Sequence, residues 1–238
     1  MKTFVISLTR STDRRIQFDK NAKYMGVYSY FDAIDGNTID ITQLKSTTFT
    51  KGSNYSKGAI GCALSHLHLW RKCIEINKPI LIMEDDAIVS VDFISHLDTV
   101  SKMLPADWDI LQLSYNFDSV LSFQNTTYEV CNGSFGQTKM KATDIERFVH
   151  SKIHPTIAKL NHSFGLSAYL ISPKGARKLK EKCFPLNNKV IVVPLINELM
   201  CHSIDCMMNA IYKDINAYVS VIPFVITPHI SDDYKSTI

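Results

Sequence analysis

The amino-acid sequence predicts an α/β sandwich with a central, mostly parallel sheet. Short apolar runs of strand length alternate with longer segments whose apolar residues recur at helical spacing. Proline, glycine and Asp-Gly turn signals separate the two kinds of segment. A strand–helix–strand order of this kind is typical of parallel sheets, because each return to the sheet needs a crossover connection.

The first elements follow from the run TFVISL and the residues after it. Thr12 suits the cap of a helix, and Gly26 suits its left-handed end. The pair Asp35–Gly36 is a turn signal that would stop a second strand. A strand, a helix and a strand are expected, in that order, at residues 3–8, 11–26 and 28–34.

The next part of the chain continues the alternation. Residues 37–55 are rich in Thr, Ser and Lys and are expected to form a surface loop. Apolar residues then recur at helical spacing up to Asn77. Pro79 leads into an apolar strand, and Pro105 would end the helix that follows. The expected elements are a helix at 57–77, a strand at 80–83, a helix at 91–104 and a strand at 109–113.

The alternation is lost in residues 114–163, which are polar and mixed in character. We expect long loops there, such as a lid over a site. The pattern then resumes, and Ser172–Pro173 is a helix-start signal. A strand, a helix, a short helix and a strand are expected at 167–172, 174–183, 205–212 and 217–222.

Size and composition suit one globular domain. The chain has 238 residues, 45% of them hydrophobic, and a formal net charge of +3. Its six cysteines are scattered and form no C-x-x-C pair, so the sequence resembles neither a zinc motif nor a disulfide framework. No apolar run reaches the roughly 18 residues of a membrane span. The modest charge gives no support for nucleic-acid binding.

The acidic triplet Glu84–Asp85–Asp86 directly follows an apolar run. In parallel α/β sheets, ligands bind at the carboxyl ends of strands. Three like charges there repel one another and resist losing water, unless a cation offsets them. Mg²⁺ and Mn²⁺ prefer carboxylate and phosphate oxygens. The alternative is that the acids favour the positive dipole at the start of the next helix.

Other enzyme classes that place acids after a strand fit the sequence less well. A phosphoacceptor receiver domain needs an Asp near position 130, where the chain reads TYEVCNGS. A Rossmann dehydrogenase needs G-x-G-x-x-G after the first strand, which SLTRSTDRR lacks, and a P-loop is also missing from the sequence. Two-metal nucleases need further well-placed acids and usually a basic groove. An enzyme that holds a nucleotide diphosphate through a cation remains.

Four motifs occur in an order that resembles glycosyltransferase family 25: FVISLTRSTDRR, FDAIDG, GAIGCALSHLHLW and ILIMEDDA. The segments FGLSAYLISPKGARKL, SIDCMM and PHISDDYKSTI are also similar to family segments. This family includes bacterial lipooligosaccharide galactosyltransferases and resembles the collagen hydroxylysine galactosyltransferases. Ala59 departs from the pattern, since many members have an acid there, and residues 114–163 carry no recognisable family motif.

The resemblance implies a GT-A-like, Rossmann-type sandwich, an inverting mechanism, a divalent cation (Mn²⁺ or Mg²⁺) and a UDP-sugar donor, most often UDP-galactose. It implies one domain, in which residues 1–113 bind the nucleotide sugar and residues 114–238 bind the acceptor. Asp86 would ligate the cation, and Glu84 would hold the ribose or a metal-bound water. His229 would close the metal site formed with Asp86 and Glu84, with an ordinary surface histidine as its alternative role.

Further donor-site positions are implied by the same motifs. Arg10 or Arg14 is expected to bind diphosphate oxygens, while the remaining arginines of that segment form a solvated helix face. His66 has the alternative of a packed core residue, and Asp85 that of a helix cap. The donor-site residues are Ser7, Leu8, Arg10, Arg14, Asp35, Gly36, Ser65, His66, Glu84 and Asp85.

The acceptor side needs a base that takes the proton from the acceptor hydroxyl. Asp205 matches a family aspartate and is the candidate, with a helix N-cap as its alternative role. Asp107 and Asp109 are reserve candidates for the base. The acceptor is expected to contact Gly165, Ser167 and Tyr169, of which Tyr169 could equally be a core residue.

Together these features predict a metal-assisted galactosyltransferase of bacterial lipooligosaccharide synthesis that forms a β-linkage. Transfer of another sugar such as glucose, a protein acceptor, and a non-catalytic sugar-nucleotide-binding module remain as alternatives. The five-residue apolar run near the start is too short for a signal-peptide core. We therefore expect a cytoplasmic protein, with peripheral contact at the inner membrane where a lipid-linked acceptor lies.

Overall fold

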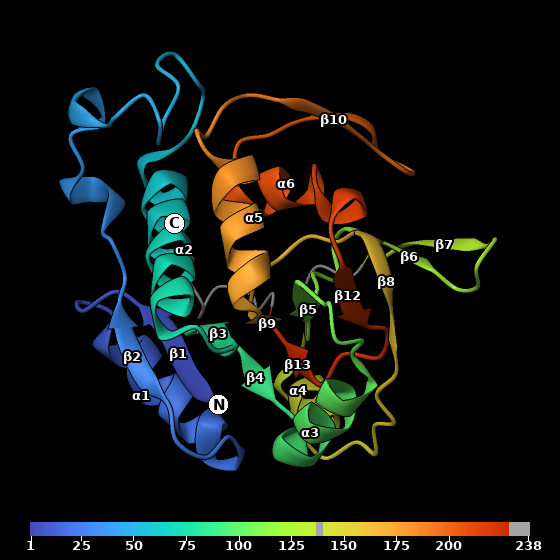
Figure 1. Cartoon of the computed structure of the whole chain (residues 1–238). Helices are drawn as coiled ribbons and strands as arrows, with labels where there is room; N and C mark the ends of the chain where they lie inside the picture. The colour runs from blue at the N-terminus through green and yellow to red at the C-terminus, as the bar shows by residue number, and fades with distance from the viewer. Residues whose placement is uncertain (137–139, 229–238) are drawn as a thin grey trace.

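A nine-stranded sheet runs through the centre of the molecule (Figure 1), in a computed structural model that describes residues 1–136 and 140–228. Its strand order is β2-β1-β3-β9-β5-β12-β8-β6-β7. The strands are β1 (Lys2–Ser7), β2 (Ser29–Asp32), β3 (Ile80–Glu84), β5 (Ile110–Gln112), β6 (Val120–Gln124), β7 (Val130–Ser134), β8 (Ile157–His162), β9 (Ala168–Ile171) and β12 (Ala217–Ser220). The predicted α/β sandwich of GT-A-like type is confirmed.

Strand direction divides this sheet into zones. Pairing is parallel along β2-β1-β3 and again between β5 and β12. Strand β9 lies between β3 and β5 and runs antiparallel to both. Strands β8, β6 and β7 continue with antiparallel pairing. The sheet as a whole is therefore mixed, and the parallel zone that the sequence predicts surrounds β1 and β3.

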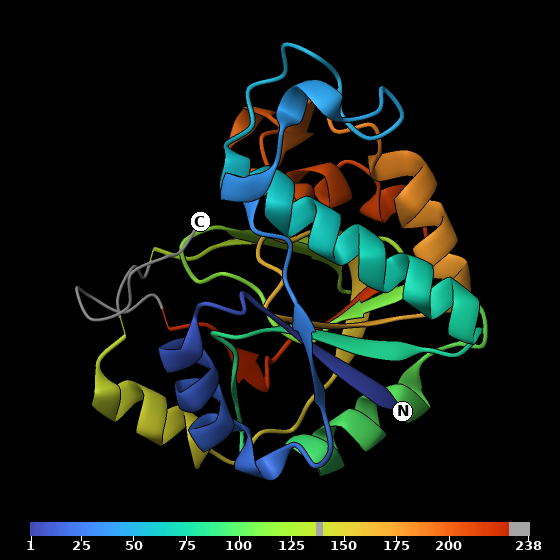
Figure 2. The same ribbon diagram turned by 90° about the vertical axis from the view of Figure 1, so that its left-hand side faces the viewer.

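Helices cover both faces of the sheet (Figure 2). One face carries α2 (Lys57–Ile76), α5 (Pro173–Cys183) and α6 (Ile204–Asn209). The other carries α1 (Thr12–Asn21), α3 (Phe93–Met103) and α4 (Ala142–Val149). Two separate hydrophobic clusters result, with Trp70 of α2 buried in the first and Phe18 of α1 buried in the second. Short 3₁₀ helices lie at Ala22–Tyr24, Gly36–Thr38, Ile41–Gln43 and Tyr212–Asp214.

Helix ends follow the local sequence closely, with two exceptions, both in α1. The Ser56 and Ser172 side chains accept the capping hydrogen bonds of α2 and α5. Asn77 ends α2 in the left-handed conformation, with φ of 51°. The predicted Thr12 cap is wrong, because Thr12 is the first residue of α1 and Ser11 precedes it without a side-chain cap. The predicted end at Gly26 is wrong, because α1 ends at Asn21 and Gly26 lies beyond the 3₁₀ helix Ala22–Tyr24.

The expectation of loops at 114–163 is also wrong. This segment forms β6, β7, α4 and β8. Its strands are short, and β7 is mostly exposed, so no apolar period shows in the sequence. Hydrogen bonds to neighbouring strands, which sequence periodicity does not reveal, hold β6 and β8 in the sheet.

Two small antiparallel pairs also escaped prediction. Strands β4 (Ile88–Val89) and β13 (Val225–Ile226) pair beside the end of β3. Strands β10 (Val190–Val193) and β11 (Asn197–Met200) form a hairpin outside the main sheet. Within the described parts of the chain, no helix has the length and apolar character to cross a bilayer.

Two glycines let the turn after β2 lie against α2. A Cβ on Gly61 would lie 2.5 Å from the Ile34 carbonyl oxygen, and one on Gly36 would lie 1.9 Å from the Lys57 carbonyl oxygen. Neither position has room for a side chain. The close approach fixes the end of β2 relative to the helix that carries Ser65 and His66.

Candidate functional site

The carboxyl ends of β1 and β3 meet at one edge of the sheet. The two strands are parallel, and Ile6 pairs with Glu84. The Ser7 hydroxyl donates a hydrogen bond to Asp85 Oδ2 over 2.7 Å, and Leu8 begins the loop that leads to α1. Ser7, Leu8 and the acidic triplet are thus placed together, as predicted for strand ends in an α/β sheet.

Glu84 is the last residue of β3, and Asp85 and Asp86 form a tight turn before β4, where the Ala87 amide donates to the Glu84 carbonyl over 3.1 Å. Helix α3 begins only at Phe93. The alternative role of these acids as a helix cap is therefore wrong, for Asp85 as for the others. Asp85 is instead held by Ser7 and by an ion pair with Arg14 of α1.

Three arginines reach acids at the strand ends. Arg14 pairs with Asp85 and lies 3.4 Å from Asp86 Oδ2. Arg10 makes two hydrogen bonds to Asp35, at 2.8 and 3.2 Å, and lowers the pKa of that exposed carboxyl. These contacts place both predicted arginines beside the acids of the expected donor site.

Arg15 does not lie on a solvated helix face as expected. Its Nε donates to the Ser7 hydroxyl over 3.2 Å, and its terminal nitrogen lies 2.6 Å from Asp32 Oδ1. The same arginine donates to the Ser7 carbonyl and stacks over the Tyr30 ring. Arg15 therefore braces the end of β1 against the end of β2, a role that local spacing along α1 does not reveal.

Asp86 has the features of a cation ligand. Burial, and then the Glu84 carboxylate, raise the pKa of Asp86 to about 7. Its Oδ1 atom is buried and has no hydrogen-bond partner among the described residues. An orphaned carboxylate oxygen beside two further acids fits Mn²⁺ or Mg²⁺, which would satisfy that oxygen and offset the repulsion. The predicted third ligand, His229, lies outside the described residues.

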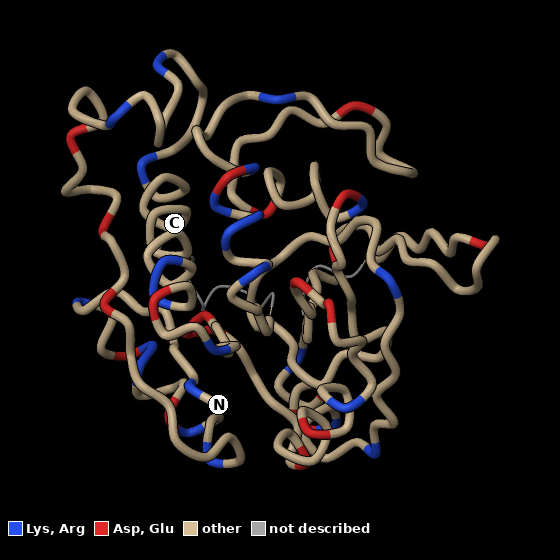
Figure 3. Tube along the Cα trace, in the orientation of Figure 1, with Lys and Arg blue, Asp and Glu red and all other residues tan. Residues whose placement is uncertain are grey.

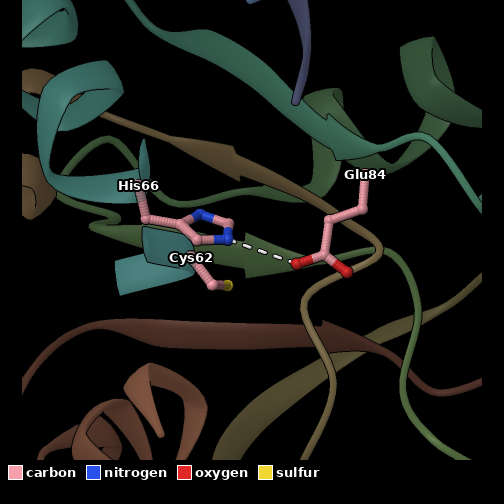
Figure 4. A group of neighbouring side chains, drawn as sticks. All are labelled: Cys62, His66 and Glu84. Atoms are coloured by element: carbon pink, nitrogen blue, oxygen red, sulfur yellow. Dashed lines mark hydrogen bonds and ion pairs between the residues drawn. The ribbon is translucent and has the colours of Figure 1, made fainter. Parts of the chain in front are cut away.

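A second group of side chains converges on Glu84 from α2 (Figure 4). His66 Nε2 lies 3.3 Å from Glu84 Oε1, and Cys62 lies one helical turn before His66. The ligand atoms of Cys62, His66 and Glu84 all lie within 4.8 Å of one another. His66 is fully buried, which agrees with its alternative role as a packed core residue, and its donor-site role stays a prediction.

Ser65 and Gly36 support the backbone around the site. The Ser65 hydroxyl accepts a hydrogen bond from the Ile34 amide over 2.9 Å and donates to the Gly61 carbonyl over 2.8 Å. Ser65 is fully buried, and Gly36 is buried against α2. These contacts hold the turn after β2, and a direct donor contact by either residue stays a prediction.

The predicted base, Asp205, lies in the first turn of α6. Asp205 follows Ile204, the first residue of α6, whereas Ser203 is the N-cap residue, so the N-cap alternative for Asp205 is wrong. Its carboxylate accepts hydrogen bonds from the Gly165 and Cys206 amides, at 3.2 and 2.9 Å, and from the Ser203 hydroxyl.

Cys62 connects the two sides of the site electrostatically. Burial, followed by the carboxylates of Glu84, Asp205 and Asp86, raises the pKa of the Cys62 thiol well above its ordinary value. The thiol therefore lies among acids of both the expected donor side and the expected acceptor side. No role was predicted for Cys62, although its spacing of four residues from His66 would place both on one helix face.

Two of the predicted acceptor residues, Gly165 and Ser167, lie just before β9, and the third, Tyr169, lies within it. The Ser167 carbonyl accepts from the Glu84 amide over 3.0 Å, and its hydroxyl bonds to Thr227. Gly165 has φ of +87°, and a Cβ there would lie 2.1 Å from Asn116 Oδ1. Tyr169 is fully buried and bonds to His66, so it faces the core side of the site rather than solvent.

Asp107 and Asp109, the reserve candidates for the base, lie at the end of the sheet where β3 and β5 begin, opposite to the acidic triplet. Asp109 immediately precedes β5, which runs in the same direction as β3 because both are antiparallel to β9. Its buried carboxylate contacts Lys178 at 2.6 Å. Asp107 bonds to the Asn216 side chain over 2.5 Å near that same end of β5. Neither residue is placed to act with the acidic triplet.

The fold and site define an α/β protein with a paired acid-and-arginine cluster at the carboxyl edge of its parallel strands. The sequence profile of glycosyltransferase family 25, described as "LPS biosynthesis protein", matches residues 1–196. The chain belongs to glycosyltransferase family 25.

Individual relatives agree with this assignment. A glycosyltransferase 25 family member of Aedes aegypti is 26% identical over 75% of this chain, and procollagen galactosyltransferase 1-A of Xenopus laevis is 24% identical over the same share. A Haemophilus influenzae protein, provisionally named a glycosyltransferase, is 29% identical over 75% of this chain and 56% of its own length. The chain spans 28% of the length of the Aedes and Xenopus relatives.

Proposed function

We propose that the chain is an inverting glycosyltransferase that moves galactose from UDP-galactose to a sugar acceptor of bacterial lipooligosaccharide, with the help of a divalent cation. Family membership supports sugar transfer, the family description supports lipopolysaccharide synthesis, and the names of the procollagen galactosyltransferases support galactose. The observation that carries the proposal is the buried Asp86 Oδ1, which has no partner within the described part of the chain and lies in an acidic turn at the carboxyl end of β3.

The roles of the residues follow from their places. Asp86 would hold the cation, and Glu84 would hold the donor ribose or a bound water. Arg14 lies beside both aspartates of the turn and would contact the diphosphate. When bound, Mn²⁺ or Mg²⁺ would neutralise charge that builds on the leaving UDP.

Asp205 would act as the base. It would accept the proton of the acceptor hydroxyl while the acceptor oxygen bonds to C1 of galactose and the bond from C1 to UDP breaks. Attack from the face opposite UDP inverts C1 and gives a β-linkage. In this proposal residues 1–113 supply the donor side, and residues 114–238 supply the acceptor side, through Gly165, Ser167 and Asp205.

Contact with a membrane surface would bring the protein to a lipid-linked acceptor. The β10–β11 hairpin exposes large apolar side chains, including Val192 at 71% and Leu195 at 65%. Helix α5, which ends at Cys183 and precedes this hairpin in the chain, carries five basic residues (Figure 3 marks Lys and Arg in blue): Lys174, Arg177, Lys178, Lys180 and Lys182. Exposed apolar groups beside basic ones favour an anionic bilayer surface.

The experiment that tests transfer is UDP release from UDP-galactose, with Mn²⁺ and a lactose- or glucose-terminated acceptor. A screen of UDP-sugars and of a hydroxylysine peptide in the same assay separates galactose from glucose and a sugar acceptor from a protein acceptor. We expect Asp86→Ala to lower the rate at least about 100-fold, in line with the loss of one key electrostatic group. Asp98→Ala, at an exposed acid paired with Lys102, is the matched control.

Two outcomes would contradict the proposal. Full activity of Asp86→Ala in the presence of a chelator would remove the cation from the mechanism. Binding of UDP-galactose without transfer or slow hydrolysis would favour the alternative of a sugar-nucleotide-binding module that has lost catalysis.

A further inference from the structure

Cys62, His66 and Glu84 bring three different metal-binding atoms to one point. Cys62 and His66 lie one turn apart on α2 and face the end of β3, where Glu84 closes the group (Figure 4). The sulfur, nitrogen and oxygen atoms lie within 4.8 Å of one another. Cys62 and Glu84 are only partly buried, which leaves a route for an ion from solvent.

The distances leave room for an ion between the three side chains. His66 Nε2 and Glu84 Oε1 are 3.3 Å apart, longer than the usual N–H···O distance of about 2.9–3.0 Å. Two ligands held about 2.0–2.1 Å from a tetrahedral Zn²⁺ lie about 3.4 Å apart. A sulfur ligand would lie about 3.6 Å from the other two, so the cluster would contract by about 1 Å on binding.

The His66 ring is already oriented for a metal. Its Nδ1 lies 2.7 Å from the Tyr169 hydroxyl, which also accepts a hydrogen bond from Trp70 Nε1 over 2.9 Å. All three side chains are fully buried. Partners of this kind hold the ring of a metal-binding histidine and set which nitrogen faces the ion. Here they leave Nε2 directed at Glu84.

We propose that Cys62, His66 and Glu84 form a zinc site with an open fourth position, next to the oxygen-only cation site at Asp86, with Glu84 Oε1 as the zinc ligand and Glu84 Oε2 left for its proposed donor-site role. One thiolate, one imidazole and one carboxylate form a set that suits Zn²⁺, whereas Mg²⁺ and Mn²⁺ prefer oxygen ligands alone. Binding displaces the Cys62 thiol proton to solvent and leaves the single His66 proton on Nδ1, facing Tyr169. The bound ion ties α2 to the end of β3.

Cobalt is the spectroscopic probe for this site. Added to the metal-free full chain, one equivalent of Co²⁺ is expected to give a thiolate-to-cobalt charge-transfer band in the near ultraviolet and the intense visible bands of a tetrahedral ion. Zn²⁺ should bleach both by competition. Cys62→Ser should lose the charge-transfer band, whereas Cys131→Ser, at an exposed free cysteine, and Asp86→Asn should keep it.

Affinity and thermal stability give a second measurement. Zn²⁺ should raise the Tm of the unaltered chain and of Cys131→Ser, because an ion that binds only the folded state stabilises it. Cys62→Ser should weaken Zn²⁺ binding by at least about 100-fold, since even partners outside the ligand set contribute about 10- to 100-fold. A cobalt spectrum of octahedral oxygen ligation, without the thiolate band, would overturn the proposal.

A third measurement uses no variant, in case Cys62→Ser fails to fold. Alkylation of the unaltered chain with a thiol reagent, followed by mass spectrometry, reports each cysteine separately. Zn²⁺ is expected to protect Cys62 and to leave exposed Cys131 reactive. Equal modification of Cys62 with and without Zn²⁺ would contradict the site. None of these readouts depends on sugar transfer.

Discussion

At the scale of single residues, the site combines acids that local sequence identifies with partners that it does not. The triplet Glu84–Asp86 follows its apolar strand directly, so both its existence and its place at a strand end could be predicted. Arg15 and Cys62 could not be assigned in the same way. Their contacts with Ser7 and with the Glu84 cluster join segments that only the folded chain brings together.

Binding of Mn²⁺ should depend on pH through Asp86. The pKa of Asp86 is raised to about 7, so below that pH a cation must displace its proton. Mn²⁺ affinity is therefore expected to rise up to about tenfold per pH unit until about pH 7 and then to level off. Calorimetric titration between about pH 5.5 and 8.5 measures this. Asp86→Asn should weaken binding and flatten the profile, and Asp98→Asn should retain it.

The same pKa has a consequence for the protein without a cation. An unfolded Asp is ionised above about pH 4, whereas folded Asp86 stays protonated up to about pH 7. The folded state therefore binds the extra proton in this window, and the contribution of Asp86 to stability falls as pH rises from about 4 to about 7. An Mn²⁺ profile for Asp86→Asn identical to that of the unaltered chain would contradict the prediction on binding. Urea denaturation without a cation tests the prediction on stability, and an unchanged pH dependence in Asp86→Asn would contradict it.

At the scale of elements, caps and periodicity predicted most helices, but contacts between elements decided the rest. Helix α2 was predictable from its apolar spacing, whereas β6 and β8 depend on neighbours for their hydrogen bonds. The close approach of Gly61 to the turn after β2 is a contact of this second kind.

Gly61→Ala should destabilise the protein although Ala favours helices. In an open helix, Ala in place of Gly contributes about 1 kcal/mol. Here the added Cβ would lie 2.5 Å from the Ile34 carbonyl oxygen and 2.7 Å from the Gly36 nitrogen. We expect the free energy of unfolding to fall by about 1–3 kcal/mol, as measured by urea denaturation. Gly136→Ala, which would meet nothing within 4 Å, should be nearly neutral. A stabilised Gly61→Ala protein would contradict the contact.

The β10–β11 hairpin gives a test of membrane contact. Val192→Glu removes an apolar group that is 71% exposed and adds a negative charge. If the hairpin inserts at an anionic bilayer surface, affinity for phosphatidylglycerol-containing vesicles should fall about tenfold or more, because burying one valine contributes about 1.5 kcal/mol. Co-sedimentation measures this. Val27→Glu alters a valine that is 92% exposed elsewhere and should change little. Equal losses in both variants would exclude a specific role of the hairpin.

At the scale of the whole molecule, the alternation of strands and helices predicted the sandwich but not its strand order. Nothing in the run SAYLIS shows that β9 enters between β3 and β5 in the opposite direction. Nor does local sequence show that β12 pairs with β5 on one side and β8 on the other. The expected donor and acceptor segments therefore share one sheet.

Residues 1–113 alone are expected not to fold. In this fragment β3 would lose its partner β9, and β5 would lose both β9 and β12. Circular dichroism and amide proton dispersion should show a largely unfolded chain, whereas the full chain should unfold cooperatively. Dispersed signals and a cooperative transition in the fragment would show instead that the donor segment is an independent unit.

The antiparallel entry of β9 also constrains how the protein can mature on the ribosome. Strand β3 is synthesised early and can pair with β1 at once, but its other edge must wait until Ala168–Ile171 emerges. During that interval an apolar strand edge lies open to pairing with other chains. Chaperones that shield nascent chains would therefore act most usefully between the synthesis of β3 and the arrival of β9.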